Sequence, residues 1–448
     1  MPAGSAAFFL FAAAVFFVYW AAAGSRYARL GVVLLANYYF CARFGLFYVA
    51  LLPACSTLDY LVGLGLMRAE RPWLRRVLVA TSLVANLTLL VISRHGGWAF
   101  PLGLSFYTFQ SLTYTLDLYR RDGEGTRNLL AYLSAVTFFP TLQAGPITRV
   151  SELIQQFAER RRLDPAEGGR AFFLIALGLL KKAVIADYLA DNLVNRVFDT
   201  PNLYSGAEAL IAVYAYSLQL YYDFSGYTDI ARGVAQLLGI HLPINFNRPY
   251  SATNVADFWR RWHISFSNWL RDYLYFSLPG ARTKVMPYLN LVITMVLGGL
   301  WHGFTWPFAI WGLLHGSALA VTRGYQVRRG RARRTPPWWR RCLAVLGTYH
   351  FVCLTWLFFR ASSVDNALEM LGRIASLTAG FENVAPLLAA TMAGGYLALF
   401  VRKQWYTAAM ERFAALPFYL HAALLVLVVS ALEALGGRGS APFVYSRF

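Results

Sequence analysis

The chain has 448 residues, of which 58% are hydrophobic and only 14% are charged, and its formal net charge is +19. Soluble domains carry about a quarter charged residues, so this composition excludes an ordinary soluble protein and favours helices that cross a bilayer. The basic residues lie between apolar runs, which is typical of Lys and Arg retained on the cytoplasmic side of a membrane. A lipid bilayer is therefore the predicted partner, and nucleic acid is not. The four cysteines show no C-x-x-C spacing, and no metal site is predicted.

The apolar runs predict a series of membrane helices. The first run, Ala6 to Ala23, has no Lys or Arg before Arg26 and predicts a retained helix rather than a cleaved signal peptide. Several later runs are too short to cross a hydrocarbon core of ~30 Å, so re-entrant or half-membrane helices are expected among roughly ten to twelve in total. The later runs are 30–52, 77–93, 101–119, 129–143, 170–189, 208–225, 288–301, 305–322, 342–360, 384–401 and 417–435.

Two basic segments, 67–76 and 322–341, separate these runs and are both predicted to be cytoplasmic. The second also has the composition of a flexible linker. A third basic pair, Lys181 and Lys182, lies inside an apolar run. These two side chains are expected either to extend to the membrane interface or to meet an anionic group, and the first is favoured.

Polar residues interrupt two of the most apolar stretches. In YYDFSGYTDIARG (221–233), Asp223 is expected to pair with a buried arginine rather than to act in chemistry. The stretch 257–276 is predicted to form one amphipathic helix, either at the interface or lining a wet cavity. At ~100° per residue its polar stripe holds Asp257, Arg260, His263, Ser267, Asn268 and Arg271.

A histidine stands where another apolar helix is predicted to break. Residues 288–301 are largely apolar, and His302 follows directly, shortly before Pro307. Gly298 and Gly299 permit a close backbone approach or a bend, and the proline prevents one continuous helix. His302 is therefore interpreted as an imidazole facing something polar, or as a buried histidine bonded to a carbonyl. His315, inside the apolar stretch 308–321, is expected to be a packed residue.

The ordered motifs resemble one family. SFYTFQSLTYTLDLYR, FFPTLQAGPITR, GLLKKAVIAD, YYDFSGYTDIARG, NFNRPYSATNVADFWRRWHISFSNWLRDYLYFSLPG and NLVITMVLGGLWHG occur between Pro101 and Thr322. In this order they resemble the membrane-bound O-acyltransferase (MBOAT) family, in particular the bacterial branch around the alginate O-acetyltransferase membrane subunit. The resemblance covers about half of the chain.

The resemblance implies an all-α, polytopic membrane fold around a central tunnel or funnel. It implies that His302 is catalytic and that His263 is a second active-site residue. Further candidates for the substrate passage are Trp301, Asn268, Arg260, Asp223, Gln219, Trp306 and His315. The implied organisation is N-terminal transmembrane helices in 1–100, a catalytic core in 101–322, a basic cytoplasmic loop in 323–341, and C-terminal transmembrane helices in 342–448 that carry no visible chemistry.

These residues suit acyl transfer. A neutral imidazole can take a proton from a hydroxyl as it attacks a thioester, which is the role expected for His302, while His263 orients the acyl group or stabilises the oxyanion. The resemblance implies acetyl-CoA as donor substrate, no permanently bound cofactor, and a bacterial inner-membrane location. It also implies a periplasmic esterase-like partner and polysaccharide assembly proteins. Two alternatives remain open: transfer of D-alanine to teichoic acid, and a transporter with buried histidines.

Overall fold

The computed structural model describes residues 5–436 except 44, 96–102, 160–161, 163, 281–282 and 331–336. Throughout these described residues the regular elements are helices. They form two compact units, one from Met1–Leu179, Gly226–Pro243 and Thr407–Ser446, and the other from Leu180–Ser225, Ile244–Tyr406 and Arg447–Phe448. The predicted domain boundary at 100/101 lies outside the described residues.

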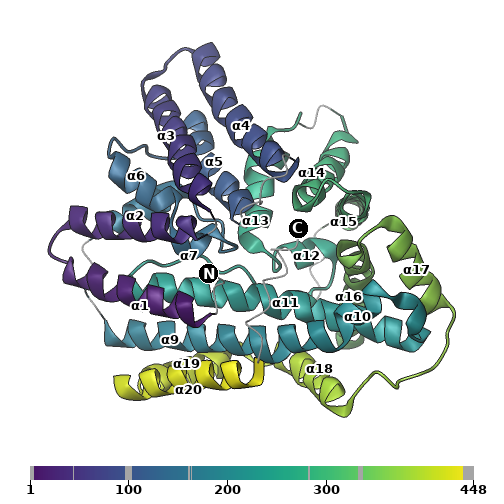
Figure 1. Cartoon of the computed structure of the whole chain (residues 1–448). Coiled ribbons are helices and arrows are strands. Elements are labelled where there is room, and N and C mark those ends of the chain that lie inside the picture. The colour runs from purple at the N-terminus through teal and green to yellow at the C-terminus, as the bar shows by residue number, and fades with distance from the viewer. Residues whose placement is uncertain are drawn as a thin grey trace. The chain divides into compact units, whose positions relative to one another are not determined.

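The first unit contains the N-terminal helices and the last two helices (Figure 1). Its helix α11 is shared, because residues up to Ser225 belong to the second unit. The helices of the first unit are α1 (Ala6–Ala21), α2 (Arg26–Ala42), α3 (Leu46–Arg68), α4 (Pro72–His95), α5 (Leu104–Arg120), α6 (Leu129–Val136), α7 (Phe139–Leu142), α8 (Val150–Ala158), α9 (Pro165–Leu180), the end of α11 (Gly206–Leu237), most of α19 (Lys403–Ala414) and α20 (Phe418–Gly436).

Helices α3, α4 and α5 contact one another (Figure 1), and the carboxylate of Asp59 is buried among their side chains. Asp59 accepts hydrogen bonds from Ser82 (2.7 Å), Asn86 (2.9 Å) and Ser111 (2.5 Å). Arg75, from the first predicted basic segment, is also buried and donates to the carbonyls of Leu66, Ala69, Leu118 and Tyr119. It thereby satisfies carbonyl groups at the C-terminal ends of α3 and α5.

The second unit carries the motif-rich part of the sequence. It begins where α9 passes into two π-helical segments, η1 (Lys181–Asp187) and η2 (Ala190–Val194). Its further elements are α10 (Asn195–Asp199), η3 (Pro201–Leu203), the start of α11, η4 (Pro249–Ser251), α12 (Val255–Trp259), α13 (Ile264–Trp269), η5 (Leu270–Leu274), η6 (Tyr275–Ser277), α14 (Met286–His302), α15 (Trp306–Arg329), α16 (Trp338–Arg360), α17 (Val364–Ala375) and α18 (Pro386–Leu399).

Helices α14 and α15 lie side by side, with glycines at their contact (Figure 1). A Cβ atom on Gly299 would lie 2.3 Å from the carbonyl oxygen of Phe308, and one on Gly312 would lie 2.4 Å from that of Met295. No side chain fits at either distance, so only glycine allows this approach. Of the close approach or bend predicted for Gly298 and Gly299, a close backbone approach is present at Gly299, where it fixes the end of α14 against α15, whereas Gly298 faces the side chain of Leu270.

Three described helices are each long and apolar enough to cross a membrane alone: Phe47–Arg68, Pro72–Ser93 and Trp338–Arg360. A bent pair, Lys403–Ala414 with Tyr419–Val428, makes a fourth if it counts as one span. Three further apolar helices are shorter, Ala6–Ala21, Leu129–Leu142 and Pro386–Leu399. The predicted span 30–52 is wrong in its limits, because α2 ends at Ala42 and α3 begins at Leu46.

The predicted linker at 322–341 is partly helical. Helix α15 continues to Arg329, and α16 begins at Trp338 directly after Pro337. Proline is favoured just before or within the first turn of a helix because its missing N–H needs no partner there. Residues 331–336, which hold three of the eight arginines of this segment, lie outside the described residues.

Candidate active site

The stretch 257–276 does not form the single amphipathic helix that its polar stripe predicts. Helix α12 ends at Trp259, α13 begins at Ile264, and a π-helical turn follows from Leu270. His263 interrupts the path with a left-handed backbone, φ +43° and ψ +54°. The stripe is therefore divided: His263 is buried with 1% exposure, whereas the side chain of Arg260 is 65% exposed.

His302 is the last residue of α14, at the helix break that the sequence predicts. Gly303 continues in an extended conformation, and α15 starts at Trp306 with Pro307 in its first turn. The imidazole is 3% exposed and is surrounded by aromatic rings. Its ring centroid lies 4.9 Å from that of Phe359 and 5.5 Å from that of Trp311, both in edge-to-face contact.

The two histidines meet at one phenyl ring. The centroid of Phe266 lies 4.9 Å from the imidazole of His263 and 5.9 Å from that of His302. Trp301 stacks on the same phenyl ring at 4.8 Å. Edge-to-face contact with Phe224, at 4.7 Å, bounds His263 on another side. The structure thus gathers His263, Trp301 and His302 into one apolar cluster around Phe266.

His315 has a different environment. The indole N–H of Trp259 donates to its Nδ1 at 3.2 Å, and its Nε2 lies 2.9 Å from the Thr355 hydroxyl. That hydroxyl donates its own hydrogen to the carbonyl of Val352, so it accepts from Nε2–H. Both ring nitrogens are therefore engaged, and His315 joins α12, α15 and α16. This is the arrangement of a packed, hydrogen-bonded core histidine.

Asp223 pairs with a lysine rather than with the predicted arginine. The ammonium of Lys182 lies 2.6 Å from the carboxylate of Asp223 and 2.7 Å from that of Asp187. The expected extension of Lys182 to the interface is also wrong, because its side chain is only 4% exposed. Two carboxylates compensate the charge that the apolar setting would otherwise penalise. The pairing joins the π-helical segment η1 to α11.

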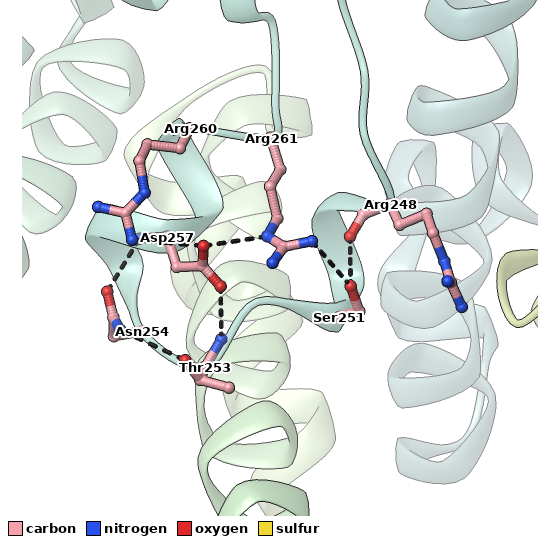
Figure 2. Close-up of polar contacts among 7 residues, drawn as sticks. All are labelled: Arg248, Ser251, Thr253, Asn254, Asp257, Arg260 and Arg261. Carbon is pink, nitrogen blue, oxygen red and sulfur yellow. Dashed lines mark hydrogen bonds and ion pairs between the residues drawn. The ribbon is translucent and has the colours of Figure 1, made fainter. Parts of the chain in front are cut away.

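Arg260 belongs to an ion-pair group on α12 and the segment before it (Figure 2). The carboxylate of Asp257 accepts from Arg260 at 3.3 Å and from Arg261 at 3.0 Å. Burial alone would raise the pKa of Asp257, but the hydrogen bond from Arg261 and the backbone N–H of Thr253 lower it. Two arginines face one acid here, so the group has surplus positive charge next to the segment that leads to His263. Arg248 joins the group only through its backbone carbonyl, which accepts from Ser251, and its guanidinium points away (Figure 2).

The remaining candidates are more dispersed. Gln219 is buried on α11, one turn before Asp223. Asn268 is exposed on α13, and Trp306 is 77% exposed at the start of α15. Gln219 is therefore inside the protein, whereas the side chains of Asn268 and Trp306 lie at its surface.

Sequence reasoning missed the contribution of α16. The C-terminal helices were expected to carry no chemistry, yet Phe359 contacts His302 and Thr355 bonds His315. It also missed Asn245, whose side chain contacts His263. In the sequence, Thr355 and Phe359 are marked only by their position in an apolar helix. That position does not distinguish residues that line a site from ordinary core residues. For Asn245, the polar NFN sequence between apolar elements was available.

Residues 67–362 match the MBOAT, membrane-bound O-acyltransferase family, so the chain belongs to this family and is an acyltransferase with an all-α, polytopic membrane fold. It is 35% identical to a peptidoglycan O-acetyltransferase of Helicobacter pylori, over 76% of this chain and 72% of the relative. It is 32% identical to the probable alginate O-acetylase AlgI of Pseudomonas putida, over 95% of both chains. It is also 30% identical to a teichoic acid D-alanyltransferase of Bacillus subtilis, over 58% of this chain and 68% of the relative.

Membership of an acyltransferase family bears on the alternatives that the sequence left open. The transporter alternative rested on buried imidazoles and broken helices alone, and it gives no account of the family match. The D-alanyl alternative is supported by the teichoic acid D-alanyltransferase relative. The sequence identity of this chain to that relative is lower, and the aligned length shorter, than for the O-acetylating relatives.

Proposed function

We propose that this acyltransferase takes an acetyl group from acetyl-CoA on the cytoplasmic side of a bacterial inner membrane. It passes the group across for O-acetylation of an extracytoplasmic polysaccharide: alginate, another exopolysaccharide or a cell-wall glycan. The O-acetylating relatives, a peptidoglycan O-acetyltransferase and a probable alginate O-acetylase, support this substrate class. A periplasmic esterase-like partner and polysaccharide assembly proteins complete the proposed pathway.

In the proposed step, His302 acts as general base. The acceptor hydroxyl attacks the thioester carbonyl, and the imidazole takes the hydroxyl proton as the C–O bond forms. The C–S bond then breaks, and the departing sulfur receives that proton to give the free thiol. His263 assists by orienting the acyl group or by donating to the oxyanion. The aromatic rings around both histidines exclude water, which would otherwise hydrolyse the thioester.

One observation carries the proposal: two buried imidazoles from different elements contact the same ring, Phe266. His302 comes from the end of α14 and His263 from the break between α12 and α13. A reacting group beside Phe266 would be within reach of both. The surplus positive charge around Asp257 further suits a donor that carries phosphate groups (Figure 2).

The test is acetyl transfer by the full chain in proteoliposomes. Radiolabelled acetyl-CoA is supplied with a polysaccharide acceptor, with and without the periplasmic partner, and labelled polymer is counted. We expect wild type to transfer label and His302→Ala to transfer almost none. His350→Ala is the matched control, because His350 is exposed on α16 and its ring bonds a carbonyl of the same helix. Full transfer by a folded His302→Ala protein would refute the catalytic assignment.

The D-alanyl alternative rests on the teichoic acid D-alanyltransferase relatives. It predicts a donor of another chemistry, a D-alanyl thioester on a carrier protein. Supplying that donor in the same proteoliposomes separates the two functions. Transfer from the carrier protein but not from acetyl-CoA would replace the acetyl proposal, and His302→Ala would abolish either activity.

A further inference from the structure

One residue, Asn245, holds the chain directly after His263 through its side chain and its backbone carbonyl. Asn245 lies in the irregular segment before α12 and is 1% exposed. Its Oδ1 accepts from the backbone N–H of Ser265 at 3.1 Å and from the Ser265 hydroxyl at 3.0 Å. The backbone carbonyl oxygen of Asn245 accepts from the backbone N–H of Ile264 at 3.0 Å. Asn245 therefore fixes the two residues that follow His263.

The same Oδ1 lies 3.2 Å from Nδ1 of His263. A backbone N–H can only donate, so the bond from Ser265 identifies the facing amide atom as the oxygen, independently of the histidine. An oxygen acceptor facing Nδ1 requires this nitrogen to carry the hydrogen. The neutral ring is then the Nδ1–H tautomer, and its lone pair is on Nε2.

The backbone at His263 also needs support. Its φ of +43° is uncommon for a residue with a side chain, although histidine adopts it more readily than bulky residues do. The hydrogen bonds that the backbone N–H groups of Ile264 and Ser265 donate to Asn245 hold the chain in this conformation. The turn directs the imidazole between the rings of Phe224 and Phe266.

We propose that Asn245 is a positioning residue for acyl transfer. It sets the tautomer and the ring orientation of His263, so that the Nε2 lone pair faces the reacting group. A lone pair accepts a hydrogen bond and cannot donate one, so of the two assisting roles proposed for His263 this geometry favours orientation of the acyl group over donation to the oxyanion. This inference rests on the proposed assisting role of His263. Asn245 acts through the histidine and not on the substrate, and this distinction determines the experiment.

A double-mutant cycle in the proteoliposome assay tests the coupling. We expect Asn245→Leu to lower kcat by about 10–100-fold, by analogy with the loss seen when the partners that orient metal-binding histidines are removed. In a His263→Ala background the same substitution should lower kcat no further, because the histidine that it orients is gone. If the two losses instead multiply, Asn245 has a separate structural effect and the inference is overturned.

Asn247→Leu is the matched control. Asn247 lies two residues away in the same segment, its side chain is exposed, and its backbone N–H donates to the carbonyl of Arg261. The same exchange of amide for isobutyl should leave kcat within twofold of wild type. An equal loss from both substitutions would mean that the segment, and not the Asn245 amide, is responsible, and would overturn the inference.

The tautomer can be read without any activity. In protein with ¹⁵N-labelled histidine, the NMR signal lost in His263→Ala identifies the ring, and we expect an Nδ1–H pattern at neutral pH. Asn245→Leu should move it toward Nε2–H. If that variant fails to fold, Asn245→Asp retains an oxygen acceptor and should keep the Nδ1–H form. An Nε2–H pattern in wild type overturns the inference.

These readouts also separate this inference from the proposed function. Full transfer by His263→Ala refutes the assisting role of His263, and with it the catalytic importance of Asn245, while the NMR tautomer still reports the geometry. Impaired transfer by His263→Ala with normal transfer by Asn245→Leu refutes only the positioning role. Impairment of both without multiplication supports both statements.

Discussion

Two regions of the second unit bury an imidazole in aromatic surroundings, and they differ in where the ring lies in the fold. His315 receives a hydrogen bond from Trp259 and gives one to Thr355, so its ring connects three helices. His302 ends a helix and meets the ring faces and edges of Phe266, Trp311 and Phe359. Burial is almost the same in both places. The difference teaches that a buried histidine is a candidate base because of its position and partners, not because it is buried.

The largest effect expected from this comparison is on chemistry at His302. His302→Ala should lower the transfer rate by about 10²–10⁴-fold, the usual contribution of a general base. Truncating this buried ring leaves a cavity, so the melting temperature in detergent should fall, and transfer is therefore compared per folded molecule. An acetyl-transfer rate within threefold of wild type would remove the distinction between the two histidines.

A similarly large effect, on stability alone, is expected at the buried ion pair. Lys182→Met leaves the carboxylates of Asp187 and Asp223 without their shared cation. Removing one partner of a buried pair costs about 3–5 kcal/mol, so the free energy of unfolding should fall by that amount. Chemical denaturation in detergent measures it. Lys181→Met, the neighbouring and less buried lysine, is the control, and an equal loss there would contradict the assignment.

A smaller loss of stability is expected when His315 is replaced. His315→Phe keeps an aromatic ring but leaves the indole N–H of Trp259 and the Thr355 hydroxyl without their partner. Unsatisfied buried groups cost about 1–3 kcal/mol, so the protein should be less stable. Transfer per folded molecule should stay within a few-fold of wild type. A hundredfold loss of transfer in protein that melts normally would give His315 the role assigned here to His302.

The smallest effect on stability is expected at Arg260. Its side chain is 65% exposed, and its ion pair with Asp257 resembles the surface pairs that contribute about 0–1 kcal/mol. Arg260→Ala should therefore leave the melting temperature nearly unchanged. If the arginines near Asp257 attract the donor phosphates, KM for acetyl-CoA should rise several-fold at low salt and less at high salt. An unchanged KM at both salt concentrations would contradict this role.

Local signals in the sequence predicted some of these features well. The helix break at His302 follows from Gly303 and Pro307, which lie within five residues and act directly on the backbone. The tight contact of Gly299 follows from the absence of a side chain. The all-α membrane class follows from composition and from the length of the apolar runs. These properties depend on neighbouring residues or on averages over the chain.

Features set by distant partners were not predictable from the pattern. The left-handed turn at His263 is held by Asn245, 18 residues earlier, and periodicity instead predicted a continuous helix. Lys182 forms an ion pair with Asp223, which lies 41 residues later in the chain, and hydropathy alone cannot predict such a pairing. The roles of Thr355 and Phe359 likewise depend on how α16 packs. Tertiary contacts override local preference at these sites.

The positive φ at His263 has a practical consequence. Glycine adopts this backbone geometry without strain, so His263→Gly would keep the path of the chain while deleting the ring. What remains between Phe224 and Phe266 is a vacancy with the dimensions of a five-membered heterocycle. A diffusible azole added to the buffer could fill it. The dihedral angle thus makes this side chain replaceable by a soluble reagent, and offers a chemical means of turning the enzyme on.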